Sequence, residues 1–295
     1  MLNDIKQIKG SLLVFLSSIL FGSYGIWSVL VGKDFGIFFQ GYIRALIVLA
    51  FLIPICIYFK SWVKIEKGDY KPLTIFSLFV VFTQAPLYYA FQNSGVGIAS
   101  LVFFTTYLII QYIFGYLYLA EKIDKIKIVS FILAIVGLLF VFNTSVGVFS
   151  LFALLMASLN GVASGAEIAS TKSIRKDIGV VQTSIIGWVA IVITHLPLSL
   201  IFNEKQIFPA FGIEWIAMFC FAISGMLAFM FVVYGYKSVE ASIGGLIGLL
   251  EIVFAIIFGA LVFNEKITLS IILGSIIIIS AAALPYLVDI YKNKA

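Results

Sequence analysis

The 295-residue sequence has few charged residues, cysteines and histidines, and each shortage excludes a class of protein. Only 11% of the residues are charged, whereas soluble domains usually carry about 25%. Its two cysteines, Cys56 and Cys220, both lie inside apolar runs and cannot form the framework of a small disulfide-rich scaffold. With one histidine and no CxxC or HExxH pattern, we predict no metal site and no cofactor.

Apolar residues are correspondingly abundant. They make up 62% of the chain, and the mean hydropathy is +1.16. A chain of this size could not hide so much apolar surface from water, so we expect it to lie in a lipid bilayer. The net charge of +5 does not indicate nucleic acid, because no basic stripe interleaved with aromatic residues occurs.

Ten apolar runs are long enough to cross a membrane. A bilayer core about 30 Å thick needs about 20 apolar residues of helix. The runs cover residues 11–31, 38–59, 73–92, 97–119, 127–143, 148–171, 180–202, 213–236, 241–263 and 268–288. The sequence therefore predicts an all-α integral membrane protein with ten transmembrane helices.

The lysines and arginines predict the orientation of these helices. When the N-terminus is placed in the cytoplasm, 15 of the 19 basic residues fall on the cytoplasmic side and 3 on the outer side. The remaining one, Arg44, lies inside a span. Because positive residues concentrate on the cytoplasmic side of membrane proteins, we expect both the N- and the C-terminus to be cytoplasmic.

The chain contains an internal repeat of about 143 residues. Three matches carry it: Glu121-Lys122-Ile123 with Glu265-Lys266-Ile267 (offset 144), Pro54 with Pro197 (offset 143), and Ala99-Ser100-Leu101 with Ala241-Ser242-Ile243 (offset 142). Residues 1–145 and 146–295 then form two five-helix repeats. Since five is odd, the second repeat enters the membrane from the opposite side. Such inverted repeats are typical of secondary transporters, although an old duplication kept only as scaffold would leave the same pattern.

With these features the chain resembles a known family, the EamA-type branch of the drug/metabolite transporter superfamily. The resemblance rests on the order and spacing of Phe21-Gly22-Ser23-Tyr24-Gly25, Arg44-Ala45-Leu46, Tyr88-Tyr89-Ala90, Gly97-Ile98-Ala99-Ser100-Leu101, Tyr234, Leu250-Glu251 and the two Glu-Lys-Ile boxes. It implies small-molecule substrates such as amino acids, most often exported, with protons or the substrate's own gradient as the driving force. Two positions depart from the family pattern: Phe21 stands where tryptophan is common, and Ile252 where proline often follows the membrane glutamate.

Four ionisable residues lie inside predicted spans, where a charge costs about 2.5–3.5 kcal/mol at the helix centre. Glu251 fits a partner for a substrate amine or a proton carrier, and equally a structural acid bonded to a neighbouring helix. Arg44 fits a clamp for a substrate carboxylate, or a side chain that snorkels or caps carbonyl groups.

The other two ionisable residues favour structural roles. Glu167 lies near the end of its span, where it could pair with Lys172 or Lys176. His195 precedes Pro197 and could bond a carbonyl group freed by the proline, with a proton relay as the alternative.

Uncharged polar residues predict the wall of a central cavity. Gln84, Tyr88 and Gln92 are spaced i, i+4, i+8 on one helix face, and Pro86 would kink the helix between them. Further candidates for the cavity are Tyr24, Trp27, Tyr107, Gln111, Asn160 and Tyr234.

The sequence thus predicts a secondary transporter, acting as a monomer or homodimer in the cytoplasmic membrane of a prokaryote. We expect it to export small polar metabolites by alternating access. An uptake permease of the same fold is the first alternative, and a membrane-embedded lipid-processing enzyme is the second. Against the enzyme stands the lack of any set of catalytic residues.

Overall fold

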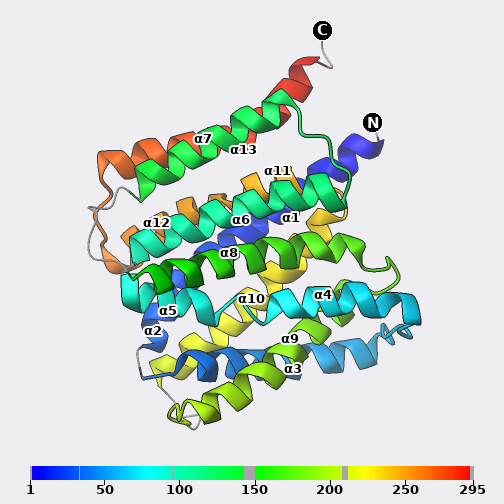
Figure 1. Cartoon of the computed structure of the whole chain (residues 1–295), viewed down its shortest axis with the longest axis vertical. Helices are drawn as coiled ribbons and strands as arrows, with labels where there is room; N and C mark the ends of the chain where they lie inside the picture. The colour runs from blue at the N-terminus through cyan, green and yellow to red at the C-terminus, as the bar shows by residue number, and fades with distance from the viewer. Residues whose placement is uncertain (1, 33, 95, 143–149, 208–211, 293–295) are drawn as a thin grey trace.

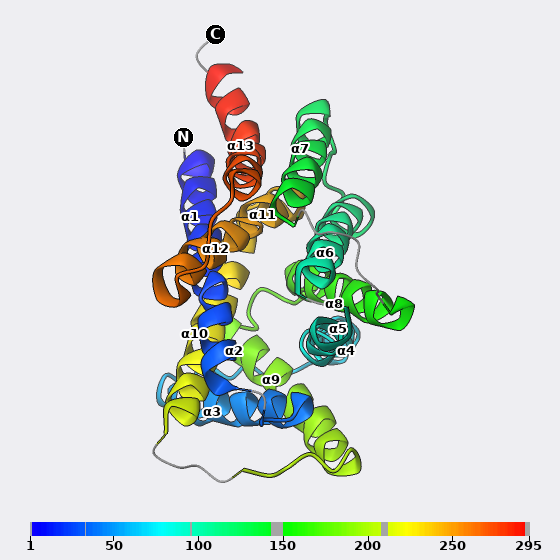
Figure 2. The same ribbon diagram turned by 90° about the vertical axis from the view of Figure 1, so that its left-hand side faces the viewer.

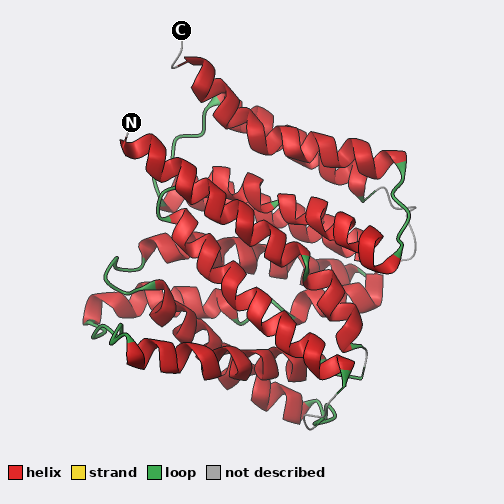
Figure 3. Ribbon diagram, turned by 180° about the vertical axis from the view of Figure 1, so that it is seen from behind, coloured by secondary structure: helices red, strands yellow, loops and turns green. Residues whose placement is uncertain are grey.

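A computed structural model describes residues 2–32, 34–94, 96–142, 150–207 and 212–292. Within these ranges the chain is helical and contains no strand (Figure 3). Helices are the expected solution for apolar runs in lipid, because each helix satisfies its own backbone hydrogen bonds. In this described part, nine helices, some of them interrupted, are long and apolar enough to cross a membrane. The fifth predicted span forms a helix of 17 residues, which is one turn shorter than most of the others.

Each half of the chain contributes five spans. The first half contains α1 (Leu2–Gly22), α2 (Tyr24–Val31), α3 (Ile37–Tyr58), the 3-10 turn η1 (Lys67–Asp69), α4 (Tyr70–Val80), α5 (Ala85–Ser94), α6 (Val96–Tyr118) and α7 (Lys125–Val141). The second half contains α8 (Leu151–Ser170), η2 (Thr171–Ser173), α9 (Val180–Ile201), α10 (Ile213–Tyr236), α11 (Ala241–Gly248), α12 (Leu250–Phe263) and α13 (Leu269–Lys292).

The predicted spans agree with these helices to within a few residues, apart from the two ends of the chain. There α1 begins nine residues before, and α13 ends four residues after, the predicted span. Both extensions are polar, so apolar length alone did not reveal them. The predicted ends at residues 143 and 148, and the predicted boundary between residues 145 and 146, lie outside the described residues.

Three spans are interrupted near their middle. The first breaks at Ser23, the third at residues 81–84, and the ninth at Leu249. Pro86 is the second residue of α5, a position where its missing N–H costs no helical hydrogen bond, so the kink expected from it is present as a break. Discontinuous helices are a common feature of transporter binding sites, and these three breaks surround one region of the bundle.

The helices form a bundle with a helix pair on each flank. In Figures 1 and 2, α7 packs beside α13 at one extreme and α3 beside α9 at the other. The remaining helices lie between these two pairs. Helix α1 begins and α13 ends at the same end of the bundle, as an even number of crossings requires (Figure 1).

The helix contacts obey a two-fold relation between the halves. The two flanking pairs, α3 with α9 and α7 with α13, each join a helix to its own counterpart in the other half. The central contacts come in equivalent sets. Helix α6 packs on α8 as α11 and α12 pack on α1, and α1 packs on α10 as α8 packs on α4 and α5. The repeat seen in the sequence is therefore a repeat of packing as well.

Backbone geometry at the helix ends follows the same repeat. Helices α3 and α9 both end before a residue in the left-handed region, Lys60 (φ 48°) and Asn203 (φ 53°). Helices α6 and α12 end in the same way, before Ala120 (φ 53°) and Asn264 (φ 54°). Left-handed φ costs energy for residues with a side chain, so its recurrence at equivalent positions indicates a turn shape that both halves need.

Glycine makes the close contact between α6 and α8 possible. Gly161 and Gly165 on α8 face the α6 backbone, and a methyl group at Gly161 would collide with the carbonyl oxygen of Phe103 and with Thr106 Oγ1. Small residues at four-residue spacing allow this approach, as the Gly161-x-x-x-Gly165 motif indicates.

Gly161→Ala is therefore expected to lower the free energy of unfolding by about 1–3 kcal/mol, the usual cost of overpacking. Gly25→Ala is the matched control, because a methyl group there meets no atom within 4 Å and removes a poor helix former. Thermal unfolding of the two purified variants in the same detergent measures the effect of each substitution on stability. Equal melting temperatures would contradict the steric argument.

Candidate functional site

A cavity of about 690 Å³ lies at the centre of the bundle, next to the three helix breaks. Its wall is mostly apolar and contains a few polar side chains, which is typical of small-molecule sites. The aromatic part of the wall includes Phe21, Phe76, Phe103, Trp188, Phe221 and Phe229. Both halves of the chain contribute, so the site exists only in the folded bundle.

Arg44 carries the positive charge of the cavity. The residue is only 2% exposed; its Nε donates to the carbonyl oxygen of Gln40 at 3.3 Å, and its Nη2 donates to the side-chain oxygen of Gln84. Its Cζ lies 4.0 Å from the centroid of the Phe221 ring and 5.8 Å from that of Tyr88. Cation–π contacts and hydrogen bonds thus hold the guanidinium at the cavity wall, and the side chain does not snorkel to the membrane surface.

Two half-buried carboxyl side chains line the same cavity, and a third, Glu265, is exposed at its rim. Glu167 comes from α8, and Glu251 from the first turn of α12, immediately after the break at Leu249. Within the described ranges neither side chain takes part in an ion pair. The cavity therefore combines one guanidinium with two half-buried carboxyl groups, Glu167 and Glu251, in an apolar surrounding, where an unpaired charge is costly.

The break between α4 and α5 supplies the polar part of the wall. Gln84 lies in the break, where its carbonyl oxygen accepts from the backbone N–H of Leu87, and Tyr88 follows on α5. Asn160 on α8 is fully buried and donates to the carbonyl oxygen of Phe82 at 3.0 Å. Asn160 thereby satisfies a backbone group that the break leaves without its helical partner.

Tyr24 and Tyr107 add two hydroxyl groups to the polar lining. Tyr24 begins α2, and its ring packs edge-on against Phe221 with a centroid distance of 4.5 Å. Tyr107 on α6 is 8% exposed and its hydroxyl lies against Gly248. These two hydroxyl groups and the two carboxyl groups all border the same space.

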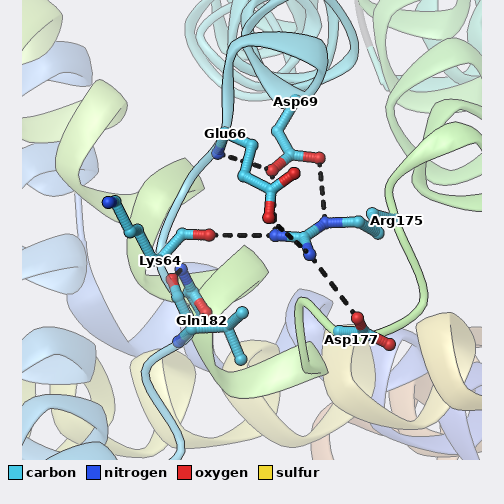
Figure 4. Close-up of polar contacts among 7 residues, drawn as sticks. Lys64, Glu66, Asp69, Arg175, Asp177 and Gln182 are labelled. Atoms are coloured by element: carbon cyan, nitrogen blue, oxygen red, sulfur yellow. Dashed lines mark hydrogen bonds and ion pairs between the residues drawn. The ribbon is translucent and has the colours of Figure 1, made fainter.

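Charged loops join the two halves at one end of the bundle. Arg175 donates from Nε and Nη2 to the carboxylate of Asp69 at 3.2 and 3.1 Å, and from Nη2 to the carbonyl oxygen of Lys64 (Figure 4). The hydrogen bonds with Asp69 raise the pKa of the Arg175 guanidinium. The Gln182 side chain bonds both the N–H and the carbonyl oxygen of Val63. These contacts tie the loop before α4 to the loop before α9. This end of the bundle, which carries Lys64, Lys172 and Lys176, is called the lysine-rich end.

Comparison with known proteins decides the family. A search against protein families matches the EamA-like transporter family twice, over residues 8–143 and 151–287. This chain belongs to the EamA-like transporter family. The two matched segments are the two repeats, and the family places the chain in the drug/metabolite transporter superfamily.

Solved structures support the fold of this EamA transporter. Twenty-eight chains match significantly. One crystal structure is 15% identical to this protein with a TM-score of 0.79, and the match covers 95% of this chain and 96% of the other. At that identity the likeness shows the fold alone. A search of curated proteins found no match.

Membership in the family settles the general class of activity. The chain is a multi-pass membrane transporter that acts on a small molecule, and EamA proteins are not enzymes. The alternative of a membrane-embedded lipid-processing enzyme is therefore excluded. Within the described ranges no group of three or more His, Cys, Asp or Glu side chains could hold a metal ion.

Some residues expected in the EamA cavity lie elsewhere. Trp27 donates from Nε1 to Ser23 Oγ at 3.0 Å and packs away from the cavity. Gln92 is exposed near the end of α5, where the helix faces the cavity with Leu87, Tyr88 and Phe91 instead. Tyr234 is 43% exposed, with Lys237 Nζ 5.2 Å from its ring centroid.

Gln111 and His195 are buried but do not line the cavity. Gln111 packs against Gly245 on α11. His195 lies between α9 and α3, against Gly41 and 5.5 Å from the centroid of the Phe38 ring. Its Nδ1 shares a hydrogen bond with the Thr194 hydroxyl. His195 thus occupies a packing position on the α3–α9 flank.

The expected pairing of Glu167 with Lys172 is wrong. Lys172 Nζ bonds Glu121 at 3.0 Å and the carbonyl oxygen of Val239 at 3.0 Å. Lys176, the other suggested partner, is exposed at the lysine-rich end. Glu167 therefore stays free of these lysines and faces the cavity.

The aromatic wall and the serines of the cavity were not predictable from the sequence. The chain has 29 phenylalanines, so nothing in the sequence marks those that face inward. The polar lining residues that were not predicted are Ser17, Ser18, Ser28, Thr83, Ser100, Ser164, Ser184 and Glu265.

Proposed function

We propose that this EamA transporter exports small zwitterionic metabolites such as amino acids, by alternating access across the cytoplasmic membrane of a prokaryote. The observation that carries the proposal is the joint presence of Arg44, Glu167 and Glu251 in the lining of one cavity. A guanidinium recognises a carboxylate through two parallel hydrogen bonds, and a carboxylate recognises an ammonium group.

The aromatic wall favours substrates with an apolar side chain. Phe221 already stacks on the Arg44 guanidinium, and the other rings leave few polar partners for a sugar or a polyanion. A substrate with both charges would occupy the site with its net charge near zero. A charge is costly in a low-dielectric cavity unless it is paired, and here each substrate charge meets an opposite protein charge.

The orientation, the coupling ion and the assembly belong to the same proposal. We place both termini in the cytoplasm because 15 of 19 basic residues fall on that side. Protons or the substrate's own gradient would drive export, and the working unit would be a monomer or homodimer. Uptake by the same mechanism is the alternative direction.

Counterflow into proteoliposomes tests the substrate class. Vesicles preloaded with one neutral-side-chain amino acid are expected to exchange it for a labelled external one, and to discriminate strongly against its N-acetyl and decarboxylated analogues. Each analogue lacks one of the two charges that the cavity can pair. Equal exchange of all three compounds would contradict zwitterion recognition. Protein-free vesicles are the control for leakage.

The direction of transport has a separate test. Cells that overproduce the protein are expected to grow better in a toxic excess of the substrate, because export lowers its internal concentration. The same cells would become more sensitive if the protein were an uptake permease. Cells that overproduce a variant inactive in counterflow are the control.

A further inference from the structure

Equivalent positions of the two repeats differ in whether they line the cavity. An offset of 144 relates Gln111, Gly115, Leu119 and Glu121 near the end of α6 to Ala255, Gly259, Phe263 and Glu265 near the end of α12. All four positions of the second repeat line the cavity, and none of the four positions of the first repeat does. The cavity therefore reaches the end of the bundle that carries Glu265 and stops before the end that carries Glu121.

Glu121 closes its end by capping α11. It is 8% exposed, and its carboxylate accepts from the backbone N–H of Ala241 at 2.7 Å and from the N–H and hydroxyl of Ser242 at 3.3 and 3.4 Å. Lys172 Nζ adds an ion pair at 3.0 Å. A carboxylate is favoured at a helix N-terminus, where the unpaired N–H groups point outward. This contact joins α6 to α11 across the two repeats.

Glu265 is the counterpart of Glu121, but its surroundings are open. Its side chain is exposed at the rim of the cavity and lies against Gly259, as the Glu121 side chain lies against Gly115. The residues equivalent to Ala241 and Ser242 are Ala99 and Ser100 in the first turns of α6. In the part of the chain that the structure describes, no hydrogen bond joins Glu265 to either of them.

Other contacts between the repeats are formed at both ends of the bundle. Glu204 accepts from the backbone N–H groups of Phe38 and Phe39 at 3.1 and 2.7 Å and caps α3. At the opposite end Gln182 of α9 bonds the backbone of Val63. The α3–α9 flank is thus closed at both ends, and the difference between the ends is found where α6, α11 and α12 meet.

We propose that Glu121 and Glu265 are alternating latches of the two gates, an inference that rests on the proposed alternating access. The structure shows the state in which Glu121 caps α11 and the Glu265 end is open. In the opposite state α6 begins three residues later, at Ala99, as α11 begins at Ala241 here, and Glu265 caps it through Ala99 and Ser100, while Glu121 leaves Ala241 and Ser242. The repeated motifs Glu-Lys-Ile and Ala-Ser are then the two parts of each latch.

Cysteine labelling tests the latches without a known substrate. In a background with Cys56→Ser and Cys220→Ser, a single reporter is placed at Ala255→Cys or at its counterpart Gln111→Cys. A bulky polar maleimide then labels the protein in nanodiscs, where both ends are accessible. Without further change, the cysteine at 255 is expected to react much faster than the one at 111.

The two latch variants are expected to act in opposite directions. Glu121→Gln should lower the ratio of the labelling rates (255 over 111) by about tenfold, as expected when a charge-assisted hydrogen bond is weakened. Glu265→Gln should raise the same ratio. Glu204→Gln is the matched control, because it weakens a helix cap of the same kind on the flank that is closed at both ends.

Folding is controlled separately. Gel filtration and melting temperature report whether Glu121→Gln unfolds the protein. Glu265 is exposed, so Glu265→Gln carries little such risk and tests the inference alone if the first variant fails to fold. Shifts of the same sign in both latch variants, or shifts no larger than that of Glu204→Gln, would overturn the proposal.

The outcome is also independent of the cargo. Opposite shifts in labelling without any amino acid counterflow would leave the latches standing and refute the substrate proposal. Amino acid counterflow without opposite shifts would refute the latches alone.

Discussion

Replacing Arg44 by glutamine is expected to lower amino acid counterflow by roughly 100-fold, while the slow exchange of the decarboxylated analogue stays nearly unchanged. The guanidinium is buried, bonded to Gln84 and stacked on Phe221, so it meets the substrate carboxylate in a fixed orientation. Removing one partner of a desolvated charge pair costs about 2–5 kcal/mol, because the other charge is left unpaired. The decarboxylated analogue has no carboxylate, so it has no contact with Arg44 that the substitution could remove.

The comparison of the two substrates separates binding from structure. A structural role for Arg44 would lower both exchange rates equally, and that result would refute the carboxylate clamp. Arg175→Gln is the matched control, since Arg175 is the only other arginine and is bonded to Asp69 at the lysine-rich end. Gln84→Ala should cause a smaller loss than Arg44→Gln, because it leaves the charge in place and removes one of its supports.

Replacing Glu251 by glutamine is expected to lower transport by roughly 30-fold at equal protein levels in the membrane. Glu251 lines the cavity at the first turn of α12, and no described residue forms an ion pair with it. A carboxylate in such an apolar site has a strong tendency to bind the substrate ammonium group. Glu240→Gln is the matched control, because Glu240 pairs with Lys127 outside the cavity.

Two transport modes distinguish the roles of Glu251. If it binds the substrate amine, counterflow and gradient-driven transport both fall in Glu251→Gln. If it carries the coupling proton, only gradient-driven transport falls, because counterflow moves no net protons. Unchanged rates in both modes would remove Glu251 from the mechanism.

Helix positions were predictable from the sequence because a bilayer imposes one simple condition on each span. About 20 apolar residues are needed to cross it, and charged residues are pushed to the ends. The breaks were harder to predict. Pro86 signalled the one at residues 81–84, whereas the breaks at Ser23 and Leu249 have only a weaker signal, the glycine directly before each of them.

Side-chain direction was less predictable than helix position. Tyr234 and Tyr236 are two residues apart on α10, a helix that is apolar on nearly all sides. The sequence offered no reason to prefer one of them, yet Tyr236 is fully buried against Gly244 and Tyr234 is exposed. In a membrane protein the lipid-facing side is as apolar as the core, so hydrophobic periodicity does not separate them.

The sequence by itself determined the class of protein, the ten helices and the two-fold repeat. These follow from apolar length, charge placement and spacing along one chain. Only the tertiary structure decided which polar groups share a space, because that depends on contacts between helices far apart in sequence. It joined Arg44 to Gln84 and Phe221, and it brought Glu167 and Glu251 to one cavity. It also placed Lys172 beside Glu121 and not beside the nearby Glu167, because packing of α6 against α8 sets distances that the order of residues does not contain.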